Sequence, residues 1–259
     1  MNVAAPGYIT DMASAVLARH VWTQVVVVAA LVVVSVGGCQ WPRDANRTLD
    51  RIREGTIKVG VAHHSPWTIA NDSRNPDRAP GGVETVLVQR LADSLGARVQ
   101  WVPGGEAELM TALSERSLDL VVAGLDAESP WEQKVALTTD YLTTDMVVAV
   151  PAGAPTDIAG QRVLVREGSV EAALLSDKDA TAVPVPEVPD RPDGAAVLPD
   201  WLVDAAGLTD SGTHLSSTDH VMAVPPGENA WQSTVERFLL ELNPDEVHRL
   251  LLDNHHAGA

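Results

Sequence analysis

Residues 81–103 read GGVETVLVQRLADSLGARVQWVP, and this stretch decides the fold class. Its apolar residues Val83, Leu87 and Leu91 recur at helical spacing, and Gly96 suits the position just after a helix. Residues 98–102, which nearly close the stretch, have the composition of a strand. A helix followed at once by a strand, with the same alternation on either side, predicts an α/β sheet.

Further elements are expected along the rest of the chain. The predicted strands are 57–61, 118–123, 146–150, 162–165, 195–198 and 220–224. The predicted helices are 106–116, 170–175, 199–206, 230–242 and a last one that starts at Pro244 with Asn243 as its cap. Residues 184–192 carry four prolines, which predicts a loop. Short apolar strands between helices are typical of a buried parallel sheet.

Composition excludes several classes of protein. The chain has 259 residues, of which 45% are hydrophobic and 20% charged, so it can bury a core and is not disordered. Its 35 acidic and 18 basic residues give a net charge of −17, which argues against a nucleic-acid partner. Cys39 is the single cysteine, so an intrachain disulfide is excluded.

The amino-terminal segment has the features of an export signal. Residues 25–36 form an apolar run of 12, whereas a membrane-spanning helix needs about 20. The small residues before Cys39 resemble a bacterial lipobox, which implies a signal peptide over 1–38 and lipidation of Cys39. Residues 39–49 are then a tether, and the protein is expected on the extracytoplasmic face of the cell membrane, held by its lipid anchor. The alternative is an uncleaved signal anchor with an inert cysteine.

The ordered set of segments resembles the type II periplasmic solute-binding proteins, specifically the amino-acid-binding family 3 of ABC transporters. The segments that carry this resemblance are TLDRIREGTIKVGV (48–61), residues 81–103, ELMTALSERSLDLVVAGL (108–125), KVALTTDYLTTDMVVAV (134–150), DIAGQRVLVREGSVEAALL (157–175), AAVLPDWLV (195–203) and HVMAVPPGENAWQSTVERFLLEL (220–242).

This resemblance implies a two-lobed α/β fold joined by two hinge strands, with a small solute bound between the lobes. Lobe 1 is expected at 50–143 and 220–255, and a trimmed lobe 2 at 144–219. The family normally has a helix where this chain has its proline-rich loop. The implied partners are an ABC permease and its ATPase, the protein acting as a monomer without a cofactor.

Three positions bear on the charge of the expected solute. Amino-acid binders of the family hold the ligand carboxylate with an Arg and a nearby Thr. The matching positions here are Trp131 and Asp126, which removes the attraction for a carboxylate. Asp200 falls where the family has the Asp that holds the ligand ammonium.

The remaining predicted ligand-binding residues are a turn and two aromatic side chains. Arg166, Gly168 and Ser169 occupy the strand-to-helix turn that contacts ligands in the family, and backbone N–H groups there can receive a polar group. Trp67 stands where the family often has a stacking aromatic, and Trp201 follows the predicted ammonium-binding residue. Aromatic faces beside carboxylates favour a cationic guest, such as an amine, a polyamine or a quaternary ammonium compound.

Other interpretations stay open beside this one. Trp131 and Trp201 can instead fill space left by the trimmed lobe, with Asp126 capping a short helix. The pair His63–His64 suggests a metal site only if further ligands lie close by. The usual hydrolase and nucleotide-binding motifs are missing, so an enzyme is not expected, and Glu106 beside other carboxylates is weak support for acid–base chemistry. The rival to transport is an adaptor or sensor with a degenerate cleft.

Overall fold

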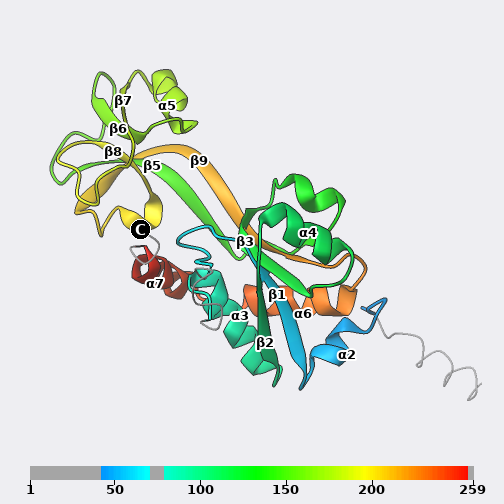
Figure 1. The fold of residues 1–259 in the computed structure, drawn as a ribbon. Coiled ribbons are helices and arrows are strands. Elements are labelled where there is room, and N and C mark those ends of the chain that lie inside the picture. The colour runs from blue at the N-terminus through cyan, green and yellow to red at the C-terminus, as the bar shows by residue number, and fades with distance from the viewer. Residues whose placement is uncertain (1–41, 71–78, 256–259) are drawn as a thin grey trace, which may run out of the picture. The chain divides into compact units, whose positions relative to one another are not determined.

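The computed structural model describes residues 42–70 and 79–255, whose strands form a single nine-stranded sheet (Figure 1). The strand order is β2-β1-β3-β9-β5-β8-β6-β7, and β4 pairs with β9 outside this path. The strands are β1 (Thr56–Val61), β2 (Arg98–Pro103), β3 (Leu120–Asp126), β4 (Ala136–Leu137), β5 (Leu142–Pro151), β6 (Arg162–Arg166), β7 (Thr181–Val185), β8 (Ala196–Pro199) and β9 (Leu208–Val224). The two-lobed α/β architecture predicted from the sequence is confirmed.

Around β1, β2 and β3 the sheet is parallel and is covered on both faces. Its helices are α2 (Thr48–Ile52), α3 (Val83–Ser94), α4 (Glu106–Ser114), α6 (Asn229–Leu240) and α7 (Pro244–Asn254). Strand β3 shows how the sequence divides the two cores. Leu120 and Val122 pack with α3 and α6, whereas Val121 and Ala123 pack with α4. This alternation is the period of two that places successive side chains on opposite faces.

The second group of cores is smaller and lies around β5, β6 and β8. Val148 and Val150 face the side that carries α5 (Glu171–Leu174), while Val147 and Ala149 face the side that carries the short 3-10 helix η3 (Asp200–Leu202). Two further 3-10 turns are η1 (Pro130–Gln133) and η2 (Ser176–Lys178).

Two long antiparallel strands connect these groups of cores. Strand β5 pairs with β9 from Leu142 opposite His220 to Pro151 opposite Leu208, with two irregularities of register on the way. Figure 1 shows both strands running from the β1–β3 part of the sheet to the β6–β8 part. We call β5 and β9 the crossover strands, because every path through the sheet from one core group to the other uses them.

Three element predictions are wrong in instructive ways. The predicted strand 220–224 is the end of the 17-residue β9, whose earlier part is polar and exposed on alternate residues. The predicted helix 199–206 is reduced to the three residues of η3. Pro184 lies inside β7 rather than in a loop, and this is tolerated because β7 is the edge strand, where a missing N–H costs no ladder bond.

Several predictions concern parts that the structure does not test. The signal peptide 1–38 and the lipidated Cys39 lie outside the described residues. The lobe limits 50–143, 144–219 and 220–255 stay predictions. Within residues 42–70 and 79–255, no helix is long and apolar enough to cross a bilayer.

Candidate functional site

A buried carboxyl lies where β1 and β3 end and β5 begins. Glu84, at the first turn of α3, is fully buried. One carboxylate oxygen accepts the backbone N–H of Gly124 at 2.9 Å, and the other accepts the hydroxyl of Tyr141 at 2.9 Å. Burial raises the pKa of Glu84 to about 7, although both hydrogen bonds oppose that shift. The carboxyl therefore joins α3, the end of β3 and the residue before β5.

Gly124 is required at its position by two independent constraints. Its φ of +60° lies in the left-handed region that side chains disfavour. A Cβ built there meets Nδ1 of His64 at 2.7 Å, a separation that Cβ atoms in proteins essentially never show. His64 is an exposed residue whose Nδ1 lies 2.9 Å from the carbonyl oxygen of Ala123. The glycine thus lets this imidazole close over the end of β3.

His220 on β9 is the second buried titratable group of the site. Its ring stacks on Trp67 with 3.7 Å between the ring centroids, and its Nε2 lies 2.9 Å from Oγ1 of Thr144 on β5. The pKa of His220 is lowered to about 4, mainly by burial and also by the nearby His64, while Asp219 opposes the shift. His220 is therefore neutral at neutral pH. Its buried Nδ1 has no hydrogen-bond partner among the described residues.

The lobe 1 residues predicted to bind ligand already have partners within the protein. Trp67 is buried against His220 and lies edge-on to Tyr141. Trp131 donates its indole N–H to Glu106 at 2.7 Å, and the Lys134 ammonium lies 5.4 Å from its ring centroid. Both tryptophans are therefore held in place by contacts within the protein, without a solute.

Asp126 is placed differently from these two tryptophans. It is exposed at the end of β3, directly opposite His220 in the β3–β9 pairing. Ser129, rather than Asp126, caps η1 with its side chain, which accepts the N–H of Trp131. The structure therefore brings Asp126 opposite His220, which in turn pairs with Leu142 at the start of β5.

The predicted turn in lobe 2 lies at the end of β6. Arg166 is exposed, and Gly168 has a φ of +75° with open space where a Cβ would stand. The Ser169 hydroxyl is buried without a partner among the described residues. Glu171, the first residue of α5, is buried and accepts the Ser216 hydroxyl at 2.7 Å, which ties the short helix to β9.

Asp200 and Trp201 are also engaged by the protein. Asp200 accepts the backbone N–H of Trp201 at 2.9 Å, a local contact that starts η3. The Trp201 ring lies edge-on to His255 at 5.5 Å and packs against the cores on both sides of the crossover strands. Trp201 therefore helps hold the end of α7 next to lobe 2.

Charge around the crossover strands is negative. Neither β5 nor β9 contains Lys or Arg, whereas the two strands carry Asp145, Asp210 and Asp219. Between β3 and the start of β5 the chain adds further acidic residues and a single lysine, Lys134, whose ammonium lies over Trp131. Clefts lined by one sign of charge concentrate solutes of the opposite sign.

Three pockets in the described part of the chain lie away from the predicted ligand-binding residues. A pocket of about 310 Å³ borders α2 and β1, one of about 400 Å³ lies between α6, α7 and the start of β5, and one of about 480 Å³ lies beside β6 and the proline-rich loop. None of the three is lined by a predicted ligand-binding residue. No group of three His, Cys, Asp or Glu side chains in the described residues is arranged to hold a metal ion, so His63 and His64 have no third ligand there.

The residues that organise this site were not predicted from the sequence. Glu84, Tyr141, Thr144 and Ser216 are not among the residues predicted to bind ligand. One signal was available. Glu84 shares its helical stripe with the apolar Val88 and Leu91, and a carboxyl on a buried stripe must find hydrogen-bond donors.

Comparison with solved structures confirms the fold. The L-cystine solute receptor of Neisseria gonorrhoeae, in its unliganded open conformation, matches with a TM-score of 0.65 and 18% identity over 80% of this chain and 96% of that chain. An ancestral cationic amino acid solute-binding protein matches with a TM-score of 0.59 and 18% identity over 80% of this chain and 99% of that one. At such low identity the likeness shows the fold alone.

Two curated relatives overturn the expectation that an enzyme is excluded. Both are named membrane-bound lytic murein transglycosylase F, which is an enzyme. The protein from Photobacterium profundum is 29% identical over 161 residues, and that from Stutzerimonas stutzeri is 30% identical over 135. These matches cover 58% and 49% of this chain, but only 30% and 27% of the relatives. The chain therefore spans less than a third of the curated relatives, and missing hydrolase motifs in this part say nothing about the rest of such proteins.

The family assignment rests on a longer match than either relative provides. The sequence model of the bacterial extracellular solute-binding proteins, family 3, matches residues 57–255, which include every strand of the sheet from β2 to β9 and almost all of β1. Since this match covers well over half of the chain, the protein belongs to the bacterial extracellular solute-binding proteins, family 3.

Proposed function

We propose that this protein captures a small amine-bearing or cationic solute outside the cytoplasm and delivers it to an ABC permease and its ATPase. It acts as a monomer held on the membrane through lipidated Cys39. Family membership supports solute capture in general. The cationic preference, the anchor and the importer are the finer parts of the proposal.

The observation that carries the cationic preference is the charge of the crossover strands. Asp145 and Asp219 lie on these strands and Asp126 lies beside them, while neither strand has a basic residue. At the two positions where amino-acid binders of the family hold a carboxylate, the chain has Asp126 and Trp131. A free carboxylate at these two positions finds no Arg to bind it and is repelled by Asp126, whereas an ammonium group finds an acceptor.

Carboxylates rather than aromatic faces supply most of this recognition. Trp67 already stacks on His220, and Trp131 is held by Glu106 and Lys134. Asp126 is exposed, so its carboxylate can reach a solute without breaking a buried contact. We therefore assign the first ammonium contact to Asp126, and a polar contact from lobe 2 to the turn of Arg166, Gly168 and Ser169.

Isothermal titration calorimetry of the protein tests the preference directly. The solutes are putrescine, choline, arginine, alanine and glutamate. We expect heat from the amines and from arginine, and none from glutamate. In the Asp126→Asn variant the affinity for amines should fall about tenfold or more, because a charge-assisted hydrogen bond is lost. Asp193→Asn, which removes a carboxylate beside the distant lobe 2 pocket, is the matched control and should bind as the parent does. Tight binding of alanine or glutamate contradicts the proposal.

A second candidate function is favoured by the curated relatives. In them, a region like this one forms less than a third of a protein named as a murein-cleaving enzyme. The chain would then be a sensor or adaptor, or one part of such an enzyme, whose site takes amine-bearing murein fragments. Uptake of a labelled solute in cells with and without the gene separates the two. Loss of uptake supports the importer, while unchanged uptake with retained binding supports the sensor.

A further inference from the structure

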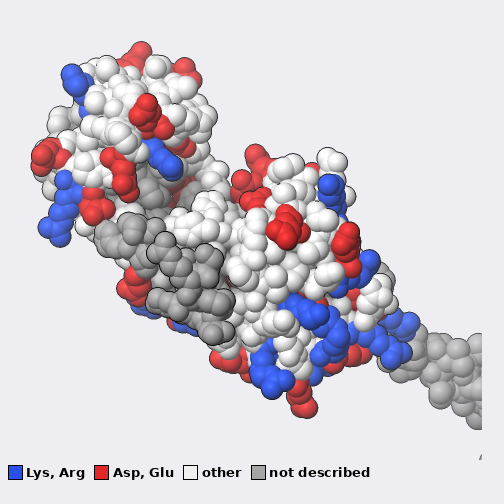
Figure 2. Space-filling view, viewed as in Figure 1, with Lys and Arg blue, Asp and Glu red and all other residues white. Residues whose placement is uncertain are grey.

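The start of the folded chain is charged oppositely to the rest. Residues 42–58 contain five Lys and Arg against three Asp and Glu, so their net charge is +2. Residues 59–259 contain 12 basic residues against 31 acidic ones, a net charge of −19. Figure 2 shows Lys and Arg side chains gathered where this segment lies. An anionic surface is repelled by the negative charge of residues 59–259. It can therefore approach the protein most easily at this positively charged end.

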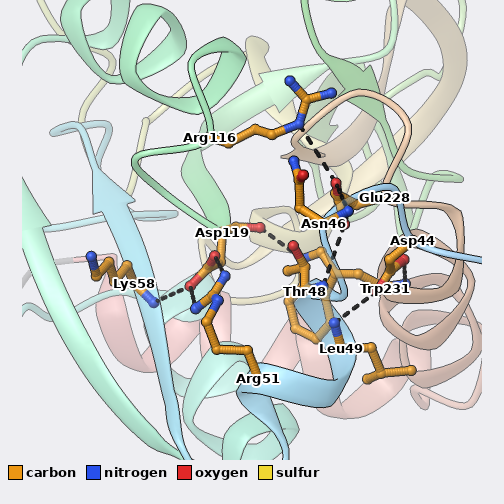
Figure 3. A network of polar contacts seen from close by, with 10 residues as sticks. All are labelled: Asp44, Asn46, Thr48, Leu49, Arg51, Lys58, Arg116, Asp119, Glu228 and Trp231. Atoms are coloured by element: carbon orange, nitrogen blue, oxygen red, sulfur yellow. Dashed lines mark hydrogen bonds and ion pairs between the residues drawn. The ribbon is translucent and has the colours of Figure 1, made fainter.

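Two of the arginines at this end hold the fold together. Arg51 pairs with the buried Asp119, and Arg116 lies with its Nε 3.5 Å from the buried carboxylate of Glu228 (Figure 3). Glu228 in turn accepts the backbone N–H of Asn46 at 3.0 Å. Because these two arginines neutralise buried carboxylates of the fold, we do not count them among the positive charges that can bind an external anion.

Four other basic residues at this end are exposed: Arg47, Arg53, Lys58 and Arg98. Lys58 uses its backbone N–H to contact Asp119, while its ammonium points away from that network in Figure 3. We call these four residues the basic face.

The direction of the strands separates the basic face from the candidate site. Strands β1, β2 and β3 are parallel, and Thr56 pairs with Arg98 at their amino ends. Their carboxyl ends lead to His64 and Asp126. A strand of six residues spans about 20 Å, so the site lies at the far end of the lobe 1 sheet from Arg53 and Arg98, while Lys58 lies two residues into β1.

The length of the tether decides what the basic face meets. Five residue steps separate Cys39 from Asp44, where the compact unit begins. A fully extended chain of that length reaches about 18 Å at most. A lipid on Cys39 therefore keeps the start of the folded unit close to the bilayer surface, within about two Debye lengths at physiological salt.

We propose that the basic face docks against anionic phospholipid headgroups, so that the anchored protein stands with its candidate site directed away from the bilayer. The proposal rests on the anchor in the proposed function. Handing a solute to a permease requires the site to turn toward the membrane. Lasting attachment by the basic face therefore favours the sensor, and attachment that is readily broken favours the importer.

Vesicle flotation tests the docking without the lipid. The full chain carrying Cys39→Ser is mixed with vesicles of phosphatidylcholine alone, or of phosphatidylcholine with phosphatidylglycerol. We expect binding to be stronger on the anionic vesicles and to be lost at high salt. Replacing Arg47, Arg53 and Lys58 together by Gln should weaken that binding about tenfold or more.

The matched control removes the same charge from lobe 2, by replacing Arg162, Lys178 and Arg191 with Gln. All variants keep the apolar residues 25–36, so only the differences between them count, and thermal melts verify that each variant is folded. Equal binding by the two triple variants, or equal binding to both kinds of vesicle, overturns the proposal. Labelling of the unmodified chain with radioactive palmitate in cells tests the anchor separately, so failure of the anchor and failure of the basic face give different results.

Discussion

On the lobe 1 side of the crossover strands, Glu84 is fully buried and both of its carboxylate oxygens accept hydrogen bonds, whereas on the lobe 2 side the buried hydroxyl of Ser169 has no partner among the described residues. Lobe 1 also covers its sheet with helices of up to 12 residues, while α5 has four. The buried polar groups around Glu84 in lobe 1 are thus paired without a solute, whereas the Ser169 hydroxyl in lobe 2 has no partner among the described residues. From this difference we predict that substitutions in lobe 1 mainly change stability and that substitutions in lobe 2 mainly change solute binding.

The largest expected effect comes from the buried carboxyl of lobe 1. Glu84→Ala leaves the Tyr141 hydroxyl and the Gly124 N–H buried without an acceptor, and should lower the free energy of unfolding by about 3 kcal/mol. Its lobe 2 counterpart, Glu171→Ala, loses one hydrogen bond to Ser216 and should cost about 1 kcal/mol. Urea unfolding measures both, and equal losses would remove the distinction between the lobes.

The pH dependence of stability separates Glu84 from His220, since their shifts have opposite signs. The folded-state pKa of Glu84 is about 7 against a usual 4.5, so its contribution is complete below pH 4.5 and is lost as the pH rises toward 7. The folded-state pKa of His220 is about 4 against a usual 6.5, so its contribution is complete above pH 6.5 and is lost as the pH falls toward 4. Each change amounts to about 3 kcal/mol.

Two substitutions expose these opposing contributions. The unfolding free energy of the parent minus that of Glu84→Gln should fall between pH 4.5 and 7, and the same difference for His220→Gln should rise between pH 4 and 6.5. Subtraction removes the contributions of all other carboxylates. Differences that do not vary with pH would show that neither group titrates as its burial demands.

A smaller effect is expected where the two crossover strands are joined. Thr144→Val removes the hydroxyl beside Nε2 of His220 and leaves that buried nitrogen unpaired, which should cost about 1–2 kcal/mol. Thr143→Val is the neighbouring control, since its hydroxyl donates to Asp219 on the exposed side and its loss should cost less than about 0.5 kcal/mol. Thermal melts of the two variants rank them, and the reverse order would show that the His220 contact does not hold the strands.

The smallest effect on stability is predicted for the lobe 2 hydroxyl. Ser169→Ala removes a hydroxyl that bonds to none of the described residues, so the free energy of unfolding should change by less than about 0.5 kcal/mol. Its effect belongs to solute binding, where calorimetry should show weaker affinity. A clear loss of stability with unchanged affinity would mean that the hydroxyl serves the fold instead.

The helices and strands of lobe 1 could be predicted because their apolar periodicity is strong. The helix at α3 and the strands at β1 and β2 follow from residues 48–103 almost to the residue. Strand β9 could not be predicted in full, because its polar part is held by pairing with β5 and carries little apolar signal. The predicted helix 199–206 ends after the three residues of η3, and nothing in the spacing of its apolar residues indicates so early an end.

The site was less predictable than the fold for a physical reason. Periodicity reports which residues are buried, but pairing between Glu84, Tyr141 and Gly124 depends on where three separate elements end. Trp67 was predicted to stack on a ligand, and in the structure its ring lies against His220, a partner that only the packing reveals. Whether the eight predicted ligand-binding residues contact a solute stays a prediction.

The measurement that tests the central claim most directly compares one solute with and without its positive charges. Putrescine and its N,N′-diacetyl derivative share a carbon skeleton, but only putrescine carries ammonium groups. If carboxylates at the crossover strands select a cation, calorimetry should show that putrescine binds and that the diacetyl form binds at least about tenfold more weakly. In Asp126→Asn, the affinity for putrescine should fall toward that of the diacetyl form. Equal affinities for the two solutes, or no effect of Asp126→Asn, would contradict the account.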